Sequence, residues 1–285
     1  MDALIRSLID GLLLGFVYGI AAMGLTLIWG VMNVINLSHG AIIALGMFSV
    51  YLLFTALGIS AYIAVAITAV LGLLFGIVIY FIAVHRVIDA PELSTLLATY
   101  AVNMIIIGVG TSIFKTSPRN VPLDLGSVHL GPAVVPTTRL IAALVAILVA
   151  AGLFLFLKYT RPGRYIRAVT DNRDAAEIVG VPSAQVLALS FGLGTMLAAV
   201  SGALIATVFP FTILSGGSYE LKSFVIGVLG GLGNPVGSLF GGLILGDIES
   251  LVPLVMPTTW TPVLEFVLFV VILLVKPNGL FGGEE

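Results

Sequence analysis

Long apolar runs restrict this chain to a helical fold within a membrane. Several stretches longer than about 18 residues contain at most one charge, enough for a helix to cross a hydrocarbon layer roughly 30 Å thick. Lipid offers the backbone no hydrogen-bond partner, so these runs must be helices, and the alternation of a membrane barrel is absent. Hydrophobic residues are 59% of the 285 residues and charged residues 9%, against about 25% charged in soluble domains. We therefore predict an all-α, polytopic helical bundle that forms a single domain, residues 1–285.

The apolar runs predict about eight spans. Seven of these spans are continuous. The eighth apolar region is interrupted, and three arrangements remain open for it: one crossing of the membrane, two crossings or a re-entrant pair. The expected spans are 8–32, 41–57, 61–84, 93–114, 138–157, 184–209 and 261–275, with the interrupted region at 224–251.

Two apolar regions contain residues that do not suit a membrane helix. NVINLSHG, 33–40, is polar, and the Gly-rich 230–235 segment ends in Pro235, which lacks an N–H and disfavours helical geometry at the preceding residue. Aligned without gaps, 28–46 and 225–243 share three identities, including Gly40 on Gly237. Paired interrupted segments mark the pathway of many transporters. The alignment therefore predicts a possible inverted repeat.

Polar side chains at membrane depth are costly unless they face the bundle interior or a cavity. The polar residues in otherwise apolar surroundings are therefore candidates for lining a translocation pathway. Two simpler interpretations remain: 33–40 as a short wet turn, and Asn103 as a hydrogen bond between helices. The candidates are Asn33, Asn36, Ser38, His39, Asn103 and Asn234.

Charge is concentrated in one segment, KYTRPGRYIRAVTDNRDAAEIVGVPS, residues 158–183. Cytoplasmic loops of membrane proteins carry an excess of Lys and Arg, so this segment is predicted to be cytoplasmic. Counting spans places His85 and Arg86 on the same side. The less basic, proline-rich loop at 115–136 is then extracytoplasmic and is predicted to form a small hairpin. The segment holds five of the twelve Lys and Arg residues: Lys158, Arg161, Arg164, Arg167 and Arg173.

Within this segment, residues 171–180 predict a short helix. Asp171 is expected to cap its start, and Gly180 with Pro182 beyond it to end it. Asp-Ala-Ala, three further residues and Gly180 resemble the Glu-Ala-Ala-x-x-x-Gly signature of ABC-importer permeases, with Asp174 in place of Glu.

Four longer stretches extend this resemblance over most of the chain: GVMNVINLSHGAIIALG, GRYIRAVTDNRDAAEIVGVP, VLGGLGNPVGSLFGGLILGDIES and KPNGLFG. Together they resemble the permease family of branched-chain amino acid ABC importers. The resemblance implies a multi-pass protein of the cell inner membrane. It also implies a second related permease subunit, two ATP-binding cassette subunits and an extracytoplasmic substrate-binding protein as partners. ATP and Mg²⁺ would be bound by the partner subunits, with no cofactor and no metal in this chain.

The same resemblance implies where the ATPase subunits dock. Three small residues would let the short helix seat in a groove of the partner, and five charged residues would pair with that partner at the rim. The alternative is a loop that only sets orientation and touches lipid headgroups. The small residues are Ala175, Ala176 and Gly180, and the charged ones are Arg164, Arg167, Arg173, Asp174 and Glu177.

Other classes of function fit less well. A secondary transporter or channel for a small polar solute such as urea or an amide would use carboxylates within the spans, and only Asp247, Glu249 and Glu265 are available. We expect neither an enzyme nor catalytic residues. Adjacent Ser38 and His39 would point in different directions on a helix, and the chain contains no cysteine. The phosphate-loop motif is absent as well, and the net charge of -2 gives no reason to expect nucleic acid.

Overall fold

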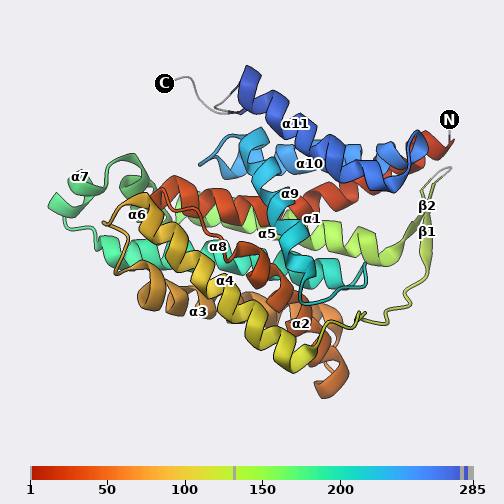
Figure 1. Ribbon diagram of the computed structural model, residues 1–285, viewed down its shortest axis with the longest axis horizontal. Helices are drawn as coiled ribbons and strands as arrows, with labels where there is room; N and C mark the ends of the chain where they lie inside the picture. Colours follow the sequence, from red (N-terminus) through yellow and green to blue (C-terminus); the bar gives the residue numbers. More distant parts are fainter. Residues whose placement is uncertain (1, 131–132, 277–278, 282–285) are drawn as a thin grey trace.

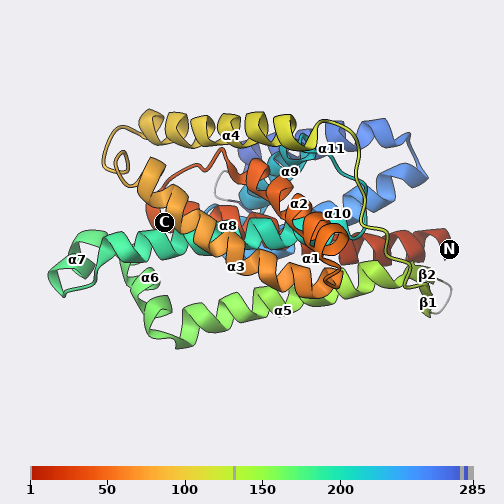
Figure 2. The same ribbon diagram turned by 90° about the horizontal axis from the view of Figure 1, so that it is seen from below.

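The computed structural model describes residues 2–130, 133–276 and 279–281 as a bundle of long helices (Figures 1 and 2). Within this described part, 8 helical segments are long and apolar enough to cross a membrane. The predicted all-α polytopic bundle is therefore confirmed. The helices are α1 (Asp2–Met32), α2 (His39–Leu57), α3 (Ala61–Ile79), α4 (Glu92–Phe114), α5 (Thr137–Tyr159), α8 (Ser183–Ala206), α10 (Pro235–Leu251) and α11 (Thr261–Val275).

Shorter elements join the long helices. A π-helical turn, Tyr80–Val84, extends α3, and α6 (Arg161–Asp171) and α7 (Arg173–Ile178) connect α5 to α8. Helix α9 (Ser215–Gly230) precedes α10, and the 3-10 turns Val252–Leu254 and Thr258–Trp260 precede α11. Strands β1 (Ser127–Leu130) and β2 (Ala133–Pro136) pair antiparallel and confirm the hairpin predicted within 115–136.

The core of the bundle lies around α1 and α8. Phe191 and Leu197 of α8 are completely buried, as is Ile28 of α1. Figure 2 shows α4 and α5 along opposite edges of the molecule with α1 and α8 between them. The peripheral helices expose many apolar side chains, Ile105 of α4 and Leu148 of α5 among them, as a membrane-spanning helix in contact with lipid does.

Glycines set the distances between the central helices. Gly15 of α1 faces Gly242 of α10, and a Cβ added at Gly15 would lie 2.7 Å from the Gly242 carbonyl oxygen. A Cβ added at Gly46 of α2 would overlap the carbonyl oxygen of Ala199 in α8. Small residues at membrane helix contacts allow this close backbone approach. Gly15 therefore lies at a packing contact between α1 and α10.

Both predicted interruptions separate two helices. Residues 33–38 lie between α1 and α2, and residues 231–234 lie between α9 and α10. The backbone turns through left-handed conformations, with φ of 51° at Asn33, 92° at Gly231 and 86° at Gly233. A Cβ added at Gly30 would lie 2.9 Å from the Cα of Gly233, so the second interruption packs against the last turn of α1. The repeat relation between them stays a prediction.

The interrupted region 224–251 contains one membrane-length helix. α9 has 16 residues and crosses the bundle at a steep angle (Figure 1), whereas α10 runs along the long axis beside α1. α11 then returns, and its last residues point toward the end of the molecule that carries α7 (Figure 1). The KPNGLFG motif at 276–282 falls partly outside the described residues.

The charged segment and the hairpin lie at opposite ends of the bundle (Figure 1). α6 and α7 project beyond the spans at one end, and β1 and β2 lie at the other with the start of α1. The connector after α3 meets α7, since Arg173 and Asp89 are ion-paired. The predicted placement of the 85–92 connector and the charged segment on the same side is thus confirmed.

Candidate functional site

Helix α6 lies against the end of α5 and presents its basic residues outward. Thr160 caps it by accepting a 3.1 Å hydrogen bond from the N–H of Gly163, and Pro162 occupies the first turn. Ile166 and Val169 are buried, three residues apart on one face. Arg164 and Arg167 of the same helix are exposed.

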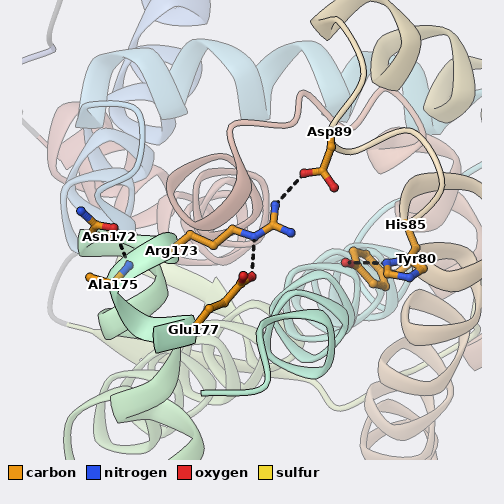
Figure 3. Close-up of polar contacts among 7 residues, drawn as sticks. All are labelled: Tyr80, His85, Asp89, Asn172, Arg173, Ala175 and Glu177. Carbon is orange, nitrogen blue, oxygen red and sulfur yellow. Dashed lines mark hydrogen bonds and ion pairs between the residues drawn. The ribbon is translucent and has the colours of Figure 1, made fainter. Parts of the chain in front are cut away.

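Helix α7 forms the outermost part of the segment. Asn172, and not Asp171, caps it: the Asn172 Oδ1 accepts a hydrogen bond from the N–H of Ala175 at 2.9 Å (Figure 3). Asp171 is the last residue of α6, because Asn172 adopts an extended conformation that separates the two helices. Gly180 ends the helix with φ 87°, and the next N–H, of Val181, bonds the carbonyl of Ala176 at 3.0 Å, as expected for a glycine C-terminal cap.

Arg173 ties α7 to the connector after α3. Its guanidinium lies 2.9 Å from the Asp89 carboxylate and 3.2 Å from that of Glu177, one turn along the helix (Figure 3). Partial burial lowers the pKa of Arg173, but the hydrogen bonds and charges of Asp89 and Glu177 outweigh it and raise the pKa overall. Tyr80 and His85 lie nearby, 3.4 Å apart between the hydroxyl and Nδ1. The arginine therefore stays charged and holds two loops together.

The exposed tip of α7 is more apolar than the signature residues alone suggested. Ile178 is 86% exposed and Val179 is 79% exposed. Ala175 is also exposed, whereas Ala176 is 4% exposed and faces the protein. Asp174 and Glu177 flank this apolar tip. Ile178 and Val179 were not singled out from the sequence. A signal for them was present, because two β-branched residues stand directly before Gly180 in an otherwise polar loop.

The polar residues of the first interruption are packed inside the protein. Asn36, Ser38 and His39 are completely buried. The Asn36 Oδ1 accepts hydrogen bonds from the Ser38 N–H at 3.1 Å and from its hydroxyl at 2.6 Å, and the His39 Nε2 lies 3.0 Å from the carbonyl oxygen of Ala21. The Thr99 hydroxyl of α4 donates to the Ile35 carbonyl at 3.2 Å. These bonds satisfy the Ser38 N–H and the Ile35 carbonyl oxygen, two backbone groups of the first interruption that need partners at membrane depth.

The other pathway candidates are spread around this region. Asn33 is exposed, and Asn103 of α4 is buried one turn beyond Thr99 with no hydrogen-bond partner for its Oδ1. Asn234 caps α10, since its Oδ1 accepts from the Gly237 N–H at 3.0 Å. The structure thus brings Asn36, Ser38 and His39 together, and leaves Asn234 at the second interruption with a capping role.

A polar cavity of about 500 Å³ lies at the hairpin end of the bundle. Lys222 of α9 lies 2.5 Å from Glu249 of α10 and 3.5 Å from Glu265 of α11, and the Glu265 side chain is 7% exposed. Arg139 at the start of α5 lies 3.0 Å from Asp10 of α1. These charges line the cavity. Two of the three carboxylates available to a secondary transporter, Glu249 and Glu265, are therefore held in an ion cluster.

Replacement of Lys222 by methionine tests this cluster. The carboxylates of Glu249 and Glu265 would lose their paired ammonium. Breaking a fully buried ion pair in this way costs about 3–5 kcal/mol of stability, and we expect a smaller loss here because the Glu249 side chain is 25% exposed. We expect a lower thermal unfolding temperature for the purified chain. Adding Glu249→Gln and Glu265→Gln to Lys222→Met should restore most of the loss, because no charge is then left unpaired. An unfolding temperature of Lys222→Met equal to that of the parent would contradict a stabilising role.

The fold defines a polytopic membrane protein with a structured, charged segment that projects beyond its membrane-length helices. The family model described as the permease component of branched-chain amino acid transport systems matches residues 7–274. The chain belongs to this family, whose members are transport permeases and not enzymes.

Curated relatives agree with this assignment. The chain is 28% identical to the high-affinity branched-chain amino acid transport system permease protein LivH of Escherichia coli K12, over 99% of this chain and 96% of that one. It is 27% identical to BraD of Pseudomonas aeruginosa, with 99% and 96% covered. The ribose import permease protein RbsC of E. coli K12 is 29% identical over 82% of this chain and 74% of its own.

A solved structure supports the fold. One chain of the structure titled "PsaBC from Streptococcus pneumoniae in complex with Fab" superposes with a TM-score of 0.51, at 19% sequence identity, covering 96% of this chain and 93% of that one. At this identity the likeness concerns the fold alone.

Proposed function

We propose that this chain is the membrane permease of an ATP-driven importer for branched-chain or related amino acids. The single observation that carries the proposal is the family match over residues 7–274. Two ATP-binding cassette subunits would supply the energy, a second related permease would complete the pathway, and an extracytoplasmic binding protein would deliver substrate. A secondary transporter or channel for urea or an amide is not favoured, because the relatives named above are components of transport systems of this kind.

The proposed substrate class rests on the names of the relatives and not on a specific binding pocket in this chain. Several relatives carry branched-chain amino acid transport in their names, and one carries ribose import. A fold shared by permeases for such different solutes favours selection by the binding protein, with brief contacts inside the permease. We propose that the pathway candidates at the two interruptions and in α4 supply those contacts: Asn33, Asn36, Ser38, His39, Asn103 and Asn234.

The charged segment is the proposed contact with the ATPase subunits. α7 projects beyond the bundle (Figure 2), with Ile178 and Val179 exposed at its tip. We propose that these two side chains enter a groove of the partner, while Asp174 and Arg164 pair at the rim. Arg173 and Glu177, already paired within the chain, would transmit movement of α7 to the connector after α3. The excess of Lys and Arg supports a cytoplasmic location for this end in an inner membrane.

Gly180 provides a test of this contact in the assembled complex. Its φ of 87° strains any residue with a Cβ, although nothing lies within 4 Å of an added Cβ. Gly180→Ala is expected to cost about 1–2 kcal/mol in the left-handed conformation and to lower substrate-stimulated ATPase activity several-fold. Gly180→Asn should retain more activity, since asparagine adopts this conformation more readily. Equal activity of Gly180→Ala and the parent would argue against a required α7 geometry.

A further inference from the structure

A cavity of about 420 Å³ lies near the α6 end of the bundle, apart from the α7 tip and the hairpin-end cavity. Its walls come from α1, α5, α6, the second interruption and the start of α10, with Leu27, Val31, Leu153 and Val236 among the lining residues. Its volume lies within the range of roughly 300–1,000 Å³ typical of small-molecule sites. The interior is apolar, and the positive charges lie at its edge.

Two cations, Lys158 and Arg167, line this edge. The Arg167 guanidinium donates to the Lys158 carbonyl oxygen at 3.3 Å, so the two residues are adjacent. The Lys158 ammonium lies 5.7 Å from the ring centroid of Phe154 and 5.4 Å from that of Tyr159. Among the described residues, neither cation has a carboxylate within ion-pair distance. The pair is therefore available to an external anion.

The position of the cavity restricts the kind of anion that can bind there. Leu27 and Val31 lie in a membrane-spanning helix, whereas Lys158 is at the end of α5, where the charged segment begins. Phe154 and Val236, which line the cavity, are 48% and 43% exposed, so the apolar interior is open toward the periphery of the chain. An apolar slot inside the membrane with basic residues at the interface matches the chemistry of an anionic phospholipid. A zwitterionic solute would leave its charges unpaired in the interior.

We propose that this cavity binds one anionic phospholipid, with an acyl chain between α1 and α5 and its phosphate between Lys158 and Arg167. The same lipid would contact Gly233 of the second interruption and Pro235 at the start of α10. It would thereby join α6, the start of the charged segment, to the point where α9 gives way to α10.

Thermal unfolding of the delipidated, purified chain in detergent tests the proposal, with phosphatidylglycerol, phosphatidylcholine, inorganic phosphate and leucine added separately. We expect phosphatidylglycerol to raise the unfolding temperature more than phosphatidylcholine, and inorganic phosphate and leucine to have no comparable effect. The double variant Lys158→Gln/Arg167→Gln should weaken phosphatidylglycerol binding about 25-fold, since each basic residue near an anionic surface contributes about fivefold.

Two further variants distinguish lipid binding at a specific site from a general effect of positive charge. Arg164→Gln removes one charge from the exposed face of the same helix, outside the cavity, and should leave the phosphatidylglycerol effect intact. Val236→Trp fills the apolar interior without changing charge and should abolish the effect. Equal stabilisation by both lipids, an undiminished effect in the double variant, loss of the effect in Arg164→Gln, or stabilisation by leucine or phosphate in place of lipid would overturn the proposal.

Discussion

Replacement of Ile178 and Val179 by aspartate is expected to reduce ATP-driven uptake by the assembled transporter at least tenfold while leaving the permease folded. Both side chains are exposed, at 86% and 79%, so their loss removes no internal packing. Truncating or charging an apolar anchor at the centre of a protein contact commonly costs 2 kcal/mol or more, which is a factor of about 30 in affinity. Co-purification of the ATPase subunits and uptake into proteoliposomes measure the two consequences.

The control for this experiment keeps the tip apolar. Ile178→Leu with Val179→Ile preserves the hydrophobic surface and should retain binding and uptake near the parent level. If the conservative double variant were as defective as the aspartate double variant, binding would depend on the exact shape of these two side chains and not on their apolar character. Full uptake by the aspartate pair, with normal recovery of the ATPase subunits, would exclude the tip of α7 as an anchor.

Gly46→Leu is expected to prevent folding of the permease. A Cβ at this position would overlap the carbonyl oxygen of Ala199, so α2 and α8 would have to separate along their contact. Backbone atoms cannot move aside as a flexible side chain can, and overpacking a tightly packed interior commonly costs 1–3 kcal/mol or more. We expect little monodisperse protein after detergent extraction, measured by size-exclusion chromatography.

Gly108→Leu is the matched control, because Gly108 lies in the membrane helix α4 with nothing within 4 Å of an added Cβ. This variant should be recovered at the parent level. Normal folding of Gly46→Leu would contradict the close contact between α2 and α8.

The long helices could be predicted because their cause is local. An apolar run without charges must form a helix in lipid, and the expected third and last spans, 61–84 and 261–275, coincide with helical segments. Other ends differ by a few residues: the first helix begins at Asp2 and not near residue 8, because helix can continue through residues outside the apolar run.

The finer features of the charged segment depend on tertiary contacts and could not be predicted in full. A six-residue helix is too short for a hydrophobic period to show that Ala176 is buried and Ala175 exposed. The Arg173 to Asp89 ion pair joins residues 84 positions apart. Similarly, the cluster of Lys222, Glu249 and Glu265 brings together three helices, and no spacing rule relates its members.

Transport through this chain is expected to depend on separate ATPase subunits attached at the charged segment. Uptake of radiolabelled leucine into proteoliposomes tests it most directly, with the permease pair, the ATPase subunits, the binding protein and ATP present together or omitted one at a time. We predict uptake only with the complete set, and its loss when the ATPase subunits or ATP are omitted. Undiminished uptake by the permease without ATPase subunits would contradict the claim.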